Sequence, residues 1–195
     1  MYSFFALISR MKHIARWSLM RNSDPENLQE HSHMAAVIAH ALAVIRRDVL
    51  GLAADPDAAA AAALFHDASE IFTGDLPTPI KYFDPDIMSA YKRVESVASL
   101  KLLAALPPEM SPAYERLLSP GADDETSSLI KAADRLAAYI KCLEELKAGN
   151  LEFRPAAQQS RNRLDALAMP EVEYFIKNFI PAFELSLDEI NLSFE

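Results

Sequence analysis

The sequence predicts an all-α fold, and three observations support this prediction. The chain has only four glycines among 195 residues, whereas folds rich in strands need many tight turns. Alanine and leucine are abundant, and both residues favour helices. The sequence also lacks a convincing alternation of β-branched and polar residues, which would indicate half-buried strands. We expect a single domain over residues 1–195, because a chain of this length can bury one complete core.

Capping residues, prolines and glycines place the individual helices. Asp-Pro pairs put an N-cap before a first-turn proline, and glycines end helices. Together these signals predict helices over residues 26–50, 56–72, 86–105, 111–118, 125–148, 153–167 and 170–180. Either Asp123 or Asp124 should cap the helix that begins at residue 125. The first dozen residues also carry one apolar face, which fits a short amphipathic helix.

The composition limits the function and the location. The chain has 28 acidic and 19 basic residues and a net charge of −9, so we do not expect it to bind a nucleic acid polymer. It lacks the run of about 18 apolar residues that a membrane span needs, and its N-terminus does not resemble a signal peptide. The single Cys142 has no partner in the chain for a disulfide. We expect a cytoplasmic protein that does not contact membranes, with Cys142 in its core.

His66 and Asp67 form the most informative pair of residues, because they lie within an alanine-rich, apolar helical run. Burial of such groups costs free energy unless they are paired or bind a metal. His31 and Asp134 lie in two other apolar helical segments. These two histidines and two aspartates suit manganese, cobalt, iron or zinc. Cobalt and manganese are the preferred ions, and magnesium is less favoured because imidazole is a soft ligand for it.

Each of these residues also has an ordinary structural interpretation. His66 and Asp67 can form a hydrogen-bonded pair at a helix edge, and Asp134 and His31 can each have a partner within the bundle. The sequence alone leaves both interpretations open. The structural interpretation is kept for the remaining histidines, which are His13, His33 and His40.

Three further residues are candidates for catalysis or substrate binding. Glu70 follows His66 by four positions, which places it over the same face of a helix and fits a proton shuttle. Arg16 offers a planar fork for phosphate oxygens, and Trp17 beside it could shape a sugar pocket. The alternatives are a solvated glutamate, a surface arginine and a core tryptophan. The proline-stiffened segment 74–83 could present the polar atoms of Asp75 and Thr78 to a substrate, with Lys81 close by, or simply form a turn.

Four motifs resemble one family when they are considered together. They are RWSLMRN at 16–22, EHSHM at 30–34, FHDASEIFTGDLPTPIKYF at 65–83 and KAADRLAAYIKCLEELKAGN at 131–150. The chain resembles the bacterial 5′-deoxynucleotidases of the YfbR type, within the HD-domain phosphohydrolases. The resemblance extends over nearly the whole chain and implies an HD-domain helical bundle.

The resemblance also implies an activity. It implies hydrolysis of deoxyribonucleoside 5′-monophosphates to deoxynucleosides and phosphate, with selectivity against ribonucleotides, one divalent metal ion and a homodimer. The implied metal ligands are His31, His66, Asp67 and Asp134. Glu70 would be the catalytic acid or base, and Arg16 would orient the phosphate. The implied substrate contacts are Arg16, Trp17, His31, Asp67, Asp75, Leu76, Pro77, Thr78 and Asp134. Trp17 would leave no room for a 2′-hydroxyl.

Several different functions remain open at this point. A related HD phosphohydrolase could act on nucleoside triphosphates or signalling nucleotides, although few basic residues lie near the motifs in the sequence. The chain could also be a non-catalytic helical module that binds metal or nucleotide, or a purely structural scaffold. For the implied homodimer, the aromatic residues near the C-terminus could supply an interface; they are Phe175, Phe179 and Phe183.

Overall fold

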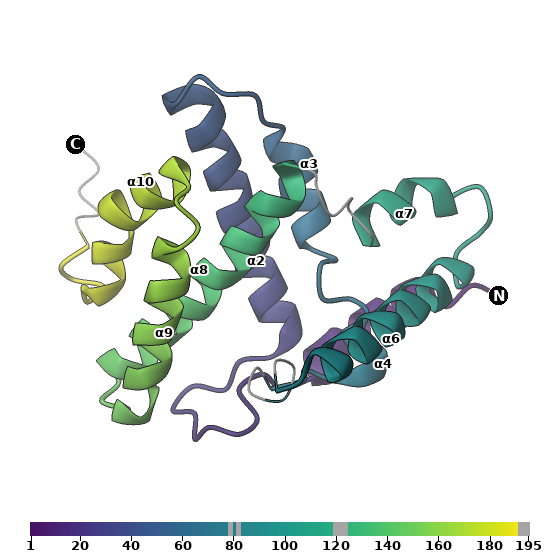
Figure 1. Cartoon of the computed structure of the whole chain (residues 1–195), viewed down its shortest axis with the longest axis horizontal. Helices are drawn as coiled ribbons and strands as arrows, with labels where there is room; N and C mark the ends of the chain where they lie inside the picture. Colours follow the sequence, from purple (N-terminus) through teal and green to yellow (C-terminus); the bar gives the residue numbers. More distant parts are fainter. Residues whose placement is uncertain (78–79, 81–82, 119–124, 191–195) are drawn as a thin grey trace.

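The computed structural model describes residues 1–77, 80, 83–118 and 125–190, and these residues form helices joined by turns (Figure 1). Within these ranges the extended backbone pairs only at an isolated antiparallel bridge between Ala15 and Asn27. The prediction of an all-α fold is therefore confirmed. Thr78, Lys81 and the two candidate caps at 123 and 124 lie outside the described residues.

The helices follow the predicted order. They are α1 (Phe4–Ile8), α2 (Leu28–Val44), α3 (Pro56–Ala63), α4 (Glu70–Thr73), α6 (Pro85–Ala104), α7 (Ser111–Leu118), α8 (Glu125–Lys147), α9 (Arg154–Asp165) and α10 (Pro170–Asn178). Short 3-10 turns cover Ser9–His13, Leu151–Phe153 and Ile180–Glu184, and a π-helical turn over Ile45–Val49 extends α2. The predicted segments other than 56–72 agree with these bounds to within one or two residues.

Side-chain caps explain why several helices begin where they do. Asn27 accepts hydrogen bonds from the backbone of Gln29 and Glu30, and the Glu30 side chain accepts one from Asn27, which makes a complete capping box at α2. Asp55 and Asp84 cap α3 and α6 in front of prolines. These caps satisfy backbone N–H groups that have no partner within the helix.

The predicted helix over 56–72 is wrong in its middle. The regular helix α3 ends at Ala63, and residues 64–69 form a series of tight turns before α4 begins at Glu70. The backbone N–H groups of Phe65, His66 and Ala68 donate to carbonyls three residues earlier rather than four. The His66 side chain also donates to the Ala63 carbonyl at 2.7 Å. This local bond competes with the helical ladder and explains the interruption.

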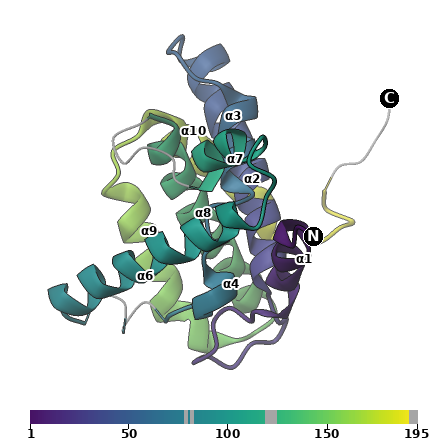
Figure 2. The same ribbon diagram turned by 90° about the vertical axis from the view of Figure 1, so that its right-hand side faces the viewer.

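Two hydrophobic clusters flank this interruption. The larger cluster fills the space between α2, α3, α8, α9 and α10, with Leu42, Leu136 and Leu164 among its fully buried members. The second cluster joins α1, α6 and α7 through Phe4, Leu102 and Leu118, and it includes Ala68 from the interrupted segment. Figures 1 and 2 show α1, α4 and α6 together in a lobe beside the main bundle. His66 and Asp67 therefore lie where the lobe joins the bundle.

Two further predictions concern single residues. Cys142 is fully buried beside Phe153, as expected for a core residue, and burial raises the pKa of its thiol to about 12. Phe175 is buried in the chain's own core, and Phe183 packs against that core, whereas Phe179 is about half exposed. Of the three aromatic residues expected at a dimer interface, Phe175 is therefore not available to a partner.

In the described part of the chain, none of the helices combines the length and apolarity that crossing a membrane requires.

Candidate metal centre

Four side chains from three separate segments converge at the junction of bundle and lobe. His31 comes from α2, His66 and Asp67 from the turns after α3, and Asp134 from α8. One ligand atom from each of the four lies within 4.8 Å of every other. His31 Nε2 is 3.0 Å from Asp134 Oδ1, and His66 Nε2 is 3.0 Å from Asp67 Oδ2. The structure thus brings together the four residues that the sequence offered as metal ligands.

The tight turns after Ala63 direct His66 and Asp67 to the same point. In a regular helix, adjacent side chains would diverge by about 100°, but here the His66 ring and the Asp67 carboxylate meet. His66 Nδ1 donates its proton to the Ala63 carbonyl. This bond fixes the ring orientation and leaves Nε2 to face the cluster, as is usual for a metal-binding histidine. His66 Nε2 is buried and is paired with the Asp67 carboxylate, 3.0 Å away.

The electrostatics of the cluster favour a positive charge. Burial alone would lower the pKa of His66, but the Asp67 and Asp134 carboxylates raise it to about 9. Burial would raise the pKa of Asp67, yet the neighbouring His66, His31 and Arg16 hold it well below its usual range. Burial would also raise the pKa of Asp134, but the hydrogen bond and charge of His31 lower it. Both carboxylates are therefore ionised at neutral pH and attract a cation to this point.

These observations show that the residues present fit a divalent cation. The cluster offers two imidazole nitrogens and two ionised carboxylate oxygens, which is a mixed donor set for a transition metal. His33 and His40 are exposed and lie outside the cluster, as the structural interpretation of these residues predicted.

Arg16 lies directly beside the cluster. Its Nη1 is 3.6 Å from Asp67 Oδ2, and its Nε donates to Glu26 Oε2 at 3.0 Å. Only 11% of the side chain is exposed. Burial alone would lower the pKa of Arg16, but the surrounding carboxylates, among them Asp67 and Asp75, raise it. The guanidinium is therefore a fixed positive charge at the edge of the metal site.

Trp17 follows Arg16 in the chain and packs against a small hydrophobic cluster that includes Cys142 and Phe153. Its ring centroid is 5.3 Å from that of Phe153, and its indole N–H donates to Glu26 Oε2 at 3.2 Å. The backbone of Trp17 has φ of 57°, in the left-handed region that non-glycine residues seldom adopt. This conformation costs on the order of 1–3 kcal/mol and persists only where the surroundings hold it.

Glu70 and the segment that follows it are placed near the site by the chain itself. Glu70 is buried and begins α4, three residues after Asp67, whose carbonyl accepts its backbone N–H. Gly74 ends α4 with φ of 72° and ψ of 166°, a conformation that essentially requires glycine. This turn leads into Asp75, Leu76 and Pro77, which are all half-buried.

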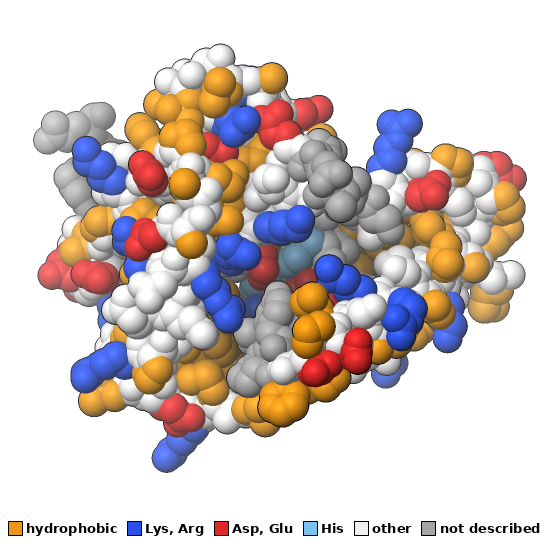
Figure 3. Space-filling view, viewed as in Figure 1, with side chains coloured by type: hydrophobic (Ala, Val, Ile, Leu, Met, Phe, Trp, Pro, Cys, Tyr) orange, Lys and Arg blue, Asp and Glu red, His pale blue; other side chains and the backbone are white. Residues whose placement is uncertain are grey.

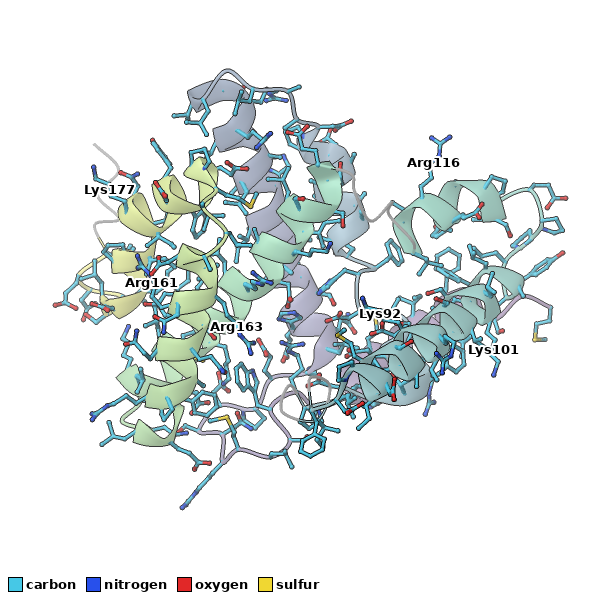
Figure 4. All side chains as sticks on the ribbon, in the orientation of Figure 1. Lys92, Lys101, Arg116, Arg161, Arg163 and Lys177 are labelled. Atoms are coloured by element: carbon cyan, nitrogen blue, oxygen red, sulfur yellow. The ribbon has the colours of Figure 1, made fainter. Side chains whose placement is uncertain are left out.

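The surroundings of the cluster are more basic than the sequence suggested. Figure 3 shows histidine and acidic side chains at the bottom of a hollow, with lysine and arginine side chains around it. In Figure 4, Lys92 from α6 and Arg163 from α9 lie on its two sides. The expectation that few basic residues lie near the motifs is therefore wrong. The motifs themselves contain seven lysines and arginines, and the fold adds Lys92 and Arg163 from other helices.

Sequence reasoning missed Glu26, which contacts both Arg16 and Trp17. It also assigned no role to Lys141 and Glu145, although both lie in the YIKCLEEL motif. Glu26 follows Arg16 by ten residues of irregular loop, so no periodic pattern connects them. Lys141 and Glu145 are buried and paired at 2.6 Å. Their i,i+4 spacing in an otherwise apolar helix was the one available signal.

The comparisons with known proteins agree with this geometry. The family model described as 5′-deoxynucleotidase YfbR-like matches residues 3–183. A protein of Vibrio parahaemolyticus named a 5′-deoxynucleotidase is 49% identical over 96% of this chain and 97% of its own length. The 5′-deoxynucleotidase YfbR of Escherichia coli O1:K1 is 48% identical over 96% of this chain and 95% of its own length.

Solved structures with lower identity share the fold. An HD-domain phosphohydrolase of Listeria innocua, 23% identical, superposes with a TM-score of 0.79 over 93% of this chain and 88% of its own. The HD phosphohydrolase DatZ of cyanophage S-2L, described as bound to dA and one catalytic Zn²⁺ ion, is 22% identical with a TM-score of 0.59 over 90% and 95% of the two chains. The fold is thus that of the HD-domain phosphohydrolases. With relatives nearly half identical over almost its full length, the chain belongs to the YfbR-like 5′-deoxynucleotidase family.

Proposed function

We propose that this protein is a metal-dependent 5′-deoxynucleotidase, which hydrolyses deoxyribonucleoside 5′-monophosphates to deoxynucleosides and phosphate. The observation that carries the proposal is the convergence of His31, His66, Asp67 and Asp134 within 4.8 Å, with Arg16 beside them. The name and the high identity of the relatives from Vibrio and Escherichia support this substrate class.

The proposed cofactor is one divalent ion held by these four residues. Cobalt and manganese are the preferred ions, and zinc, iron and magnesium are the alternatives. The catalytic Zn²⁺ ion described for the cyanophage DatZ protein supports a transition metal in this fold. When bound, such an ion supplies positive charge that polarises a phosphate group and lowers the pKa of a water molecule.

The protein's own residues would bind the phosphate and manage the proton. The Nη1 edge of Arg16 faces the cluster, so it can hold phosphate oxygens and offset the charge that grows on them during the reaction. As the water oxygen bonds to phosphorus, the bond from phosphorus to the 5′ oxygen breaks. Glu70 would take the proton that the attacking water loses and pass it to this departing oxygen, so that the protons balance.

Selectivity for deoxyribose would come from the Trp17 side chain. Trp17 is held by both Phe153 and Glu26, and a fixed indole beside the sugar would exclude a 2′-hydroxyl by its bulk. Asp75, Leu76, Pro77 and Thr78 are the proposed sugar contacts.

One experiment tests the proposal and its selectivity. Phosphate release is measured from deoxyribo- and ribonucleoside 5′-monophosphates with manganese, cobalt, zinc and magnesium. We expect turnover of the deoxy compounds with manganese or cobalt and little turnover of the ribo compounds. Trp17→Ala should reduce the ratio of deoxy to ribo turnover, whereas Trp17→Phe, which keeps most of the side-chain bulk, should preserve this ratio. A wild-type enzyme that cleaves neither class with any of these ions would overturn the proposal.

A second candidate activity has one observation in its favour. The basic side chains around the hollow in Figure 3 would suit a substrate with more than one phosphate. The same assay with nucleoside di- and triphosphates separates the two activities. Hydrolysis of triphosphates in preference to monophosphates would favour this second candidate.

The homodimer and the cytoplasmic location are also proposals. Helix α6 presents an exposed apolar surface that includes Val94, Val97 and Leu100, and such surfaces often mark protein contacts. Sedimentation velocity tests the dimer: a monomer at all concentrations would contradict it. Microscopy of the tagged protein in a bacterial cell tests the location.

A further inference from the structure

Arg16 and Trp17 lie on an irregular loop, residues 14–27, between the 3-10 turn Ser9–His13 and helix α2. Backbone bonds fix the two ends of this loop. The Arg16 N–H donates to the Glu26 carbonyl at 3.0 Å, and the Leu28 N–H donates to the Ile14 carbonyl at 2.9 Å. Between these ends, the Met20 N–H donates to the Trp17 carbonyl at 2.9 Å, and the Asn22 side chain donates to the carbonyls of Trp17 and Met20. Two larger groups of side chains also hold the loop.

The first group is Glu26 with its two partners. A single carboxylate oxygen, Oε2, accepts from Arg16 Nε at 3.0 Å and from Trp17 Nε1 at 3.2 Å. Because Arg16 Nε is engaged by Glu26, the guanidinium presents its Nη1 to Asp67. The same oxygen sets the rotation of the indole ring. One carboxylate thus orients both the proposed phosphate contact and the proposed sugar contact.

The second group ties the far side of the loop to α8. The buried Glu145 carboxylate accepts the backbone N–H groups of Ser23 and Asp24, at 2.8 Å and 3.0 Å. It also accepts Asn150 Nδ2 and Lys141 Nζ, at 2.7 Å and 2.6 Å. Lys141 Nζ donates as well to the Asp24 carbonyl.

A buried ion pair of this kind points to a role in geometry. Removing both charges from water costs free energy that their attraction repays only in part, and apolar residues often give equal stability. Among the described residues, every hydrogen bond that these two side chains make outside α8 is to loop 14–27 or to Asn150, which itself donates to the Arg21 carbonyl at 2.7 Å. The pair therefore fixes where the loop lies.

We propose that Glu26, Lys141 and Glu145 are positioning residues that hold Arg16 beside the metal cluster and Trp17 next to Arg16. Glu26 sets the orientation of the two side chains, and the Lys141–Glu145 pair sets the place of the loop that carries them. The proposal deepens the proposed deoxynucleotidase function and rests on it for its kinetic consequences, but its structural consequences are independent of activity.

The experiment uses Trp17 as a probe, because it is the only tryptophan in the chain. Emission maximum and acrylamide quenching are measured for wild type, Glu26→Ala, Glu26→Gln, Glu145→Gln and a control, Glu144→Gln. Glu144 neighbours Glu145 on α8, but its side chain is exposed. Manganese affinity is measured by calorimetry and folding by circular dichroism.

We expect a red-shifted, more quenchable Trp17 in Glu26→Ala and Glu145→Gln, with manganese affinity within about twofold of wild type. The value of kcat/KM for a deoxynucleotide should fall about 10- to 100-fold, since a displacement of about an ångström has effects of this size. The preference for deoxyribose should narrow at the same time. Glu26→Gln keeps an oxygen that can accept from both donors, so it should restore most of the Trp17 signal. Glu144→Gln should match wild type.

An unchanged Trp17 environment would contradict the proposal. If folded Glu26→Ala shows the wild-type Trp17 signal and the wild-type ratio of deoxy to ribo activity, the proposal is wrong, even if Glu145→Gln fails to fold. If the wild type cleaves no nucleotide, the proposed function fails, while the fluorescence series still decides whether these residues position the loop.

Discussion

The two ring nitrogens of His66 have different tasks, and this division explains how one residue can both interrupt a helix and serve a metal. Nδ1 donates to the Ala63 carbonyl, while Nε2 faces the carboxylates of Asp67 and Asp134. The bond at Nδ1 takes an acceptor from the helical ladder, and the tight turn that results brings the Asp67 carboxylate to the same point. The hydrogen bond that interrupts the helix therefore also places the side chains of the candidate metal site.

Glu70 provides the prediction at the scale of a residue. Glu70→Gln keeps the shape of the buried side chain but removes its ability to give up or accept a proton as a carboxyl group. If Glu70 delivers the proton to the 5′ oxygen, kcat should fall about 10²–10⁴-fold, while manganese affinity stays near that of the wild type. Steady-state kinetics and calorimetry measure the two quantities. Turnover within a few-fold of the wild type would remove Glu70 from this role.

Capping residues account for most of what could be predicted about the elements. Asp55 and Asp84 in front of prolines begin α3 and α6 as expected, because these signals act within one turn of chain. The interruption after Ala63 could not be predicted, since it depends on a hydrogen bond from the His66 side chain to the Ala63 carbonyl. The same limit applies to Glu26, whose two partners are brought to it by an irregular loop.

The α8 pair provides the prediction at the scale of an element. Hydrogen bonds from Lys141, Asn150 and the backbone of Ser23 and Asp24 outweigh the effect of burial and lower the pKa of Glu145 to about 2. A carboxyl group with a lowered folded-state pKa stabilises the fold above its ordinary pKa, near 4.5, and loses this contribution as the pH falls toward 2.

Urea unfolding of wild type and Glu145→Gln at several pH values tests this prediction. The difference in unfolding free energy should be largest above about pH 5 and should shrink steadily below pH 4. Glu144→Gln serves as the control. Partial burial raises the pKa of Glu144, so any change with pH in its unfolding free energy difference should have the opposite sign to that of Glu145→Gln. A difference between wild type and Glu145→Gln that is constant with pH would show that the charge of Glu145 does not carry the effect.

At the scale of the whole molecule, the four predicted ligands come together only because α2, α8 and the turns after α3 pack on one another. The sequence offered His31, His66, Asp67 and Asp134 as candidates from apolar surroundings and from a family resemblance. Their convergence within 4.8 Å is a property of the fold. The basic surroundings in Figure 3 have the same origin, since they combine side chains from helices far apart in the chain.

This convergence predicts that metal binding stabilises the fold. An ion that binds the folded state alone stabilises it by about 2.7 kcal/mol at a hundred times its Kd, which corresponds to a rise in Tm of roughly 5–10 °C for a chain of this size. Differential scanning fluorimetry of chelator-treated protein, with and without manganese, measures the shift. Asp134→Asn removes a charged ligand from α8 and should abolish most of it. Asp57→Asn is the matched control, because the Asp57 side chain is fully exposed on α3, and its shift should equal that of the wild type. An equal shift in Asp134→Asn would mean that manganese binds elsewhere, and the four side chains would then need another explanation for their shared burial and charge.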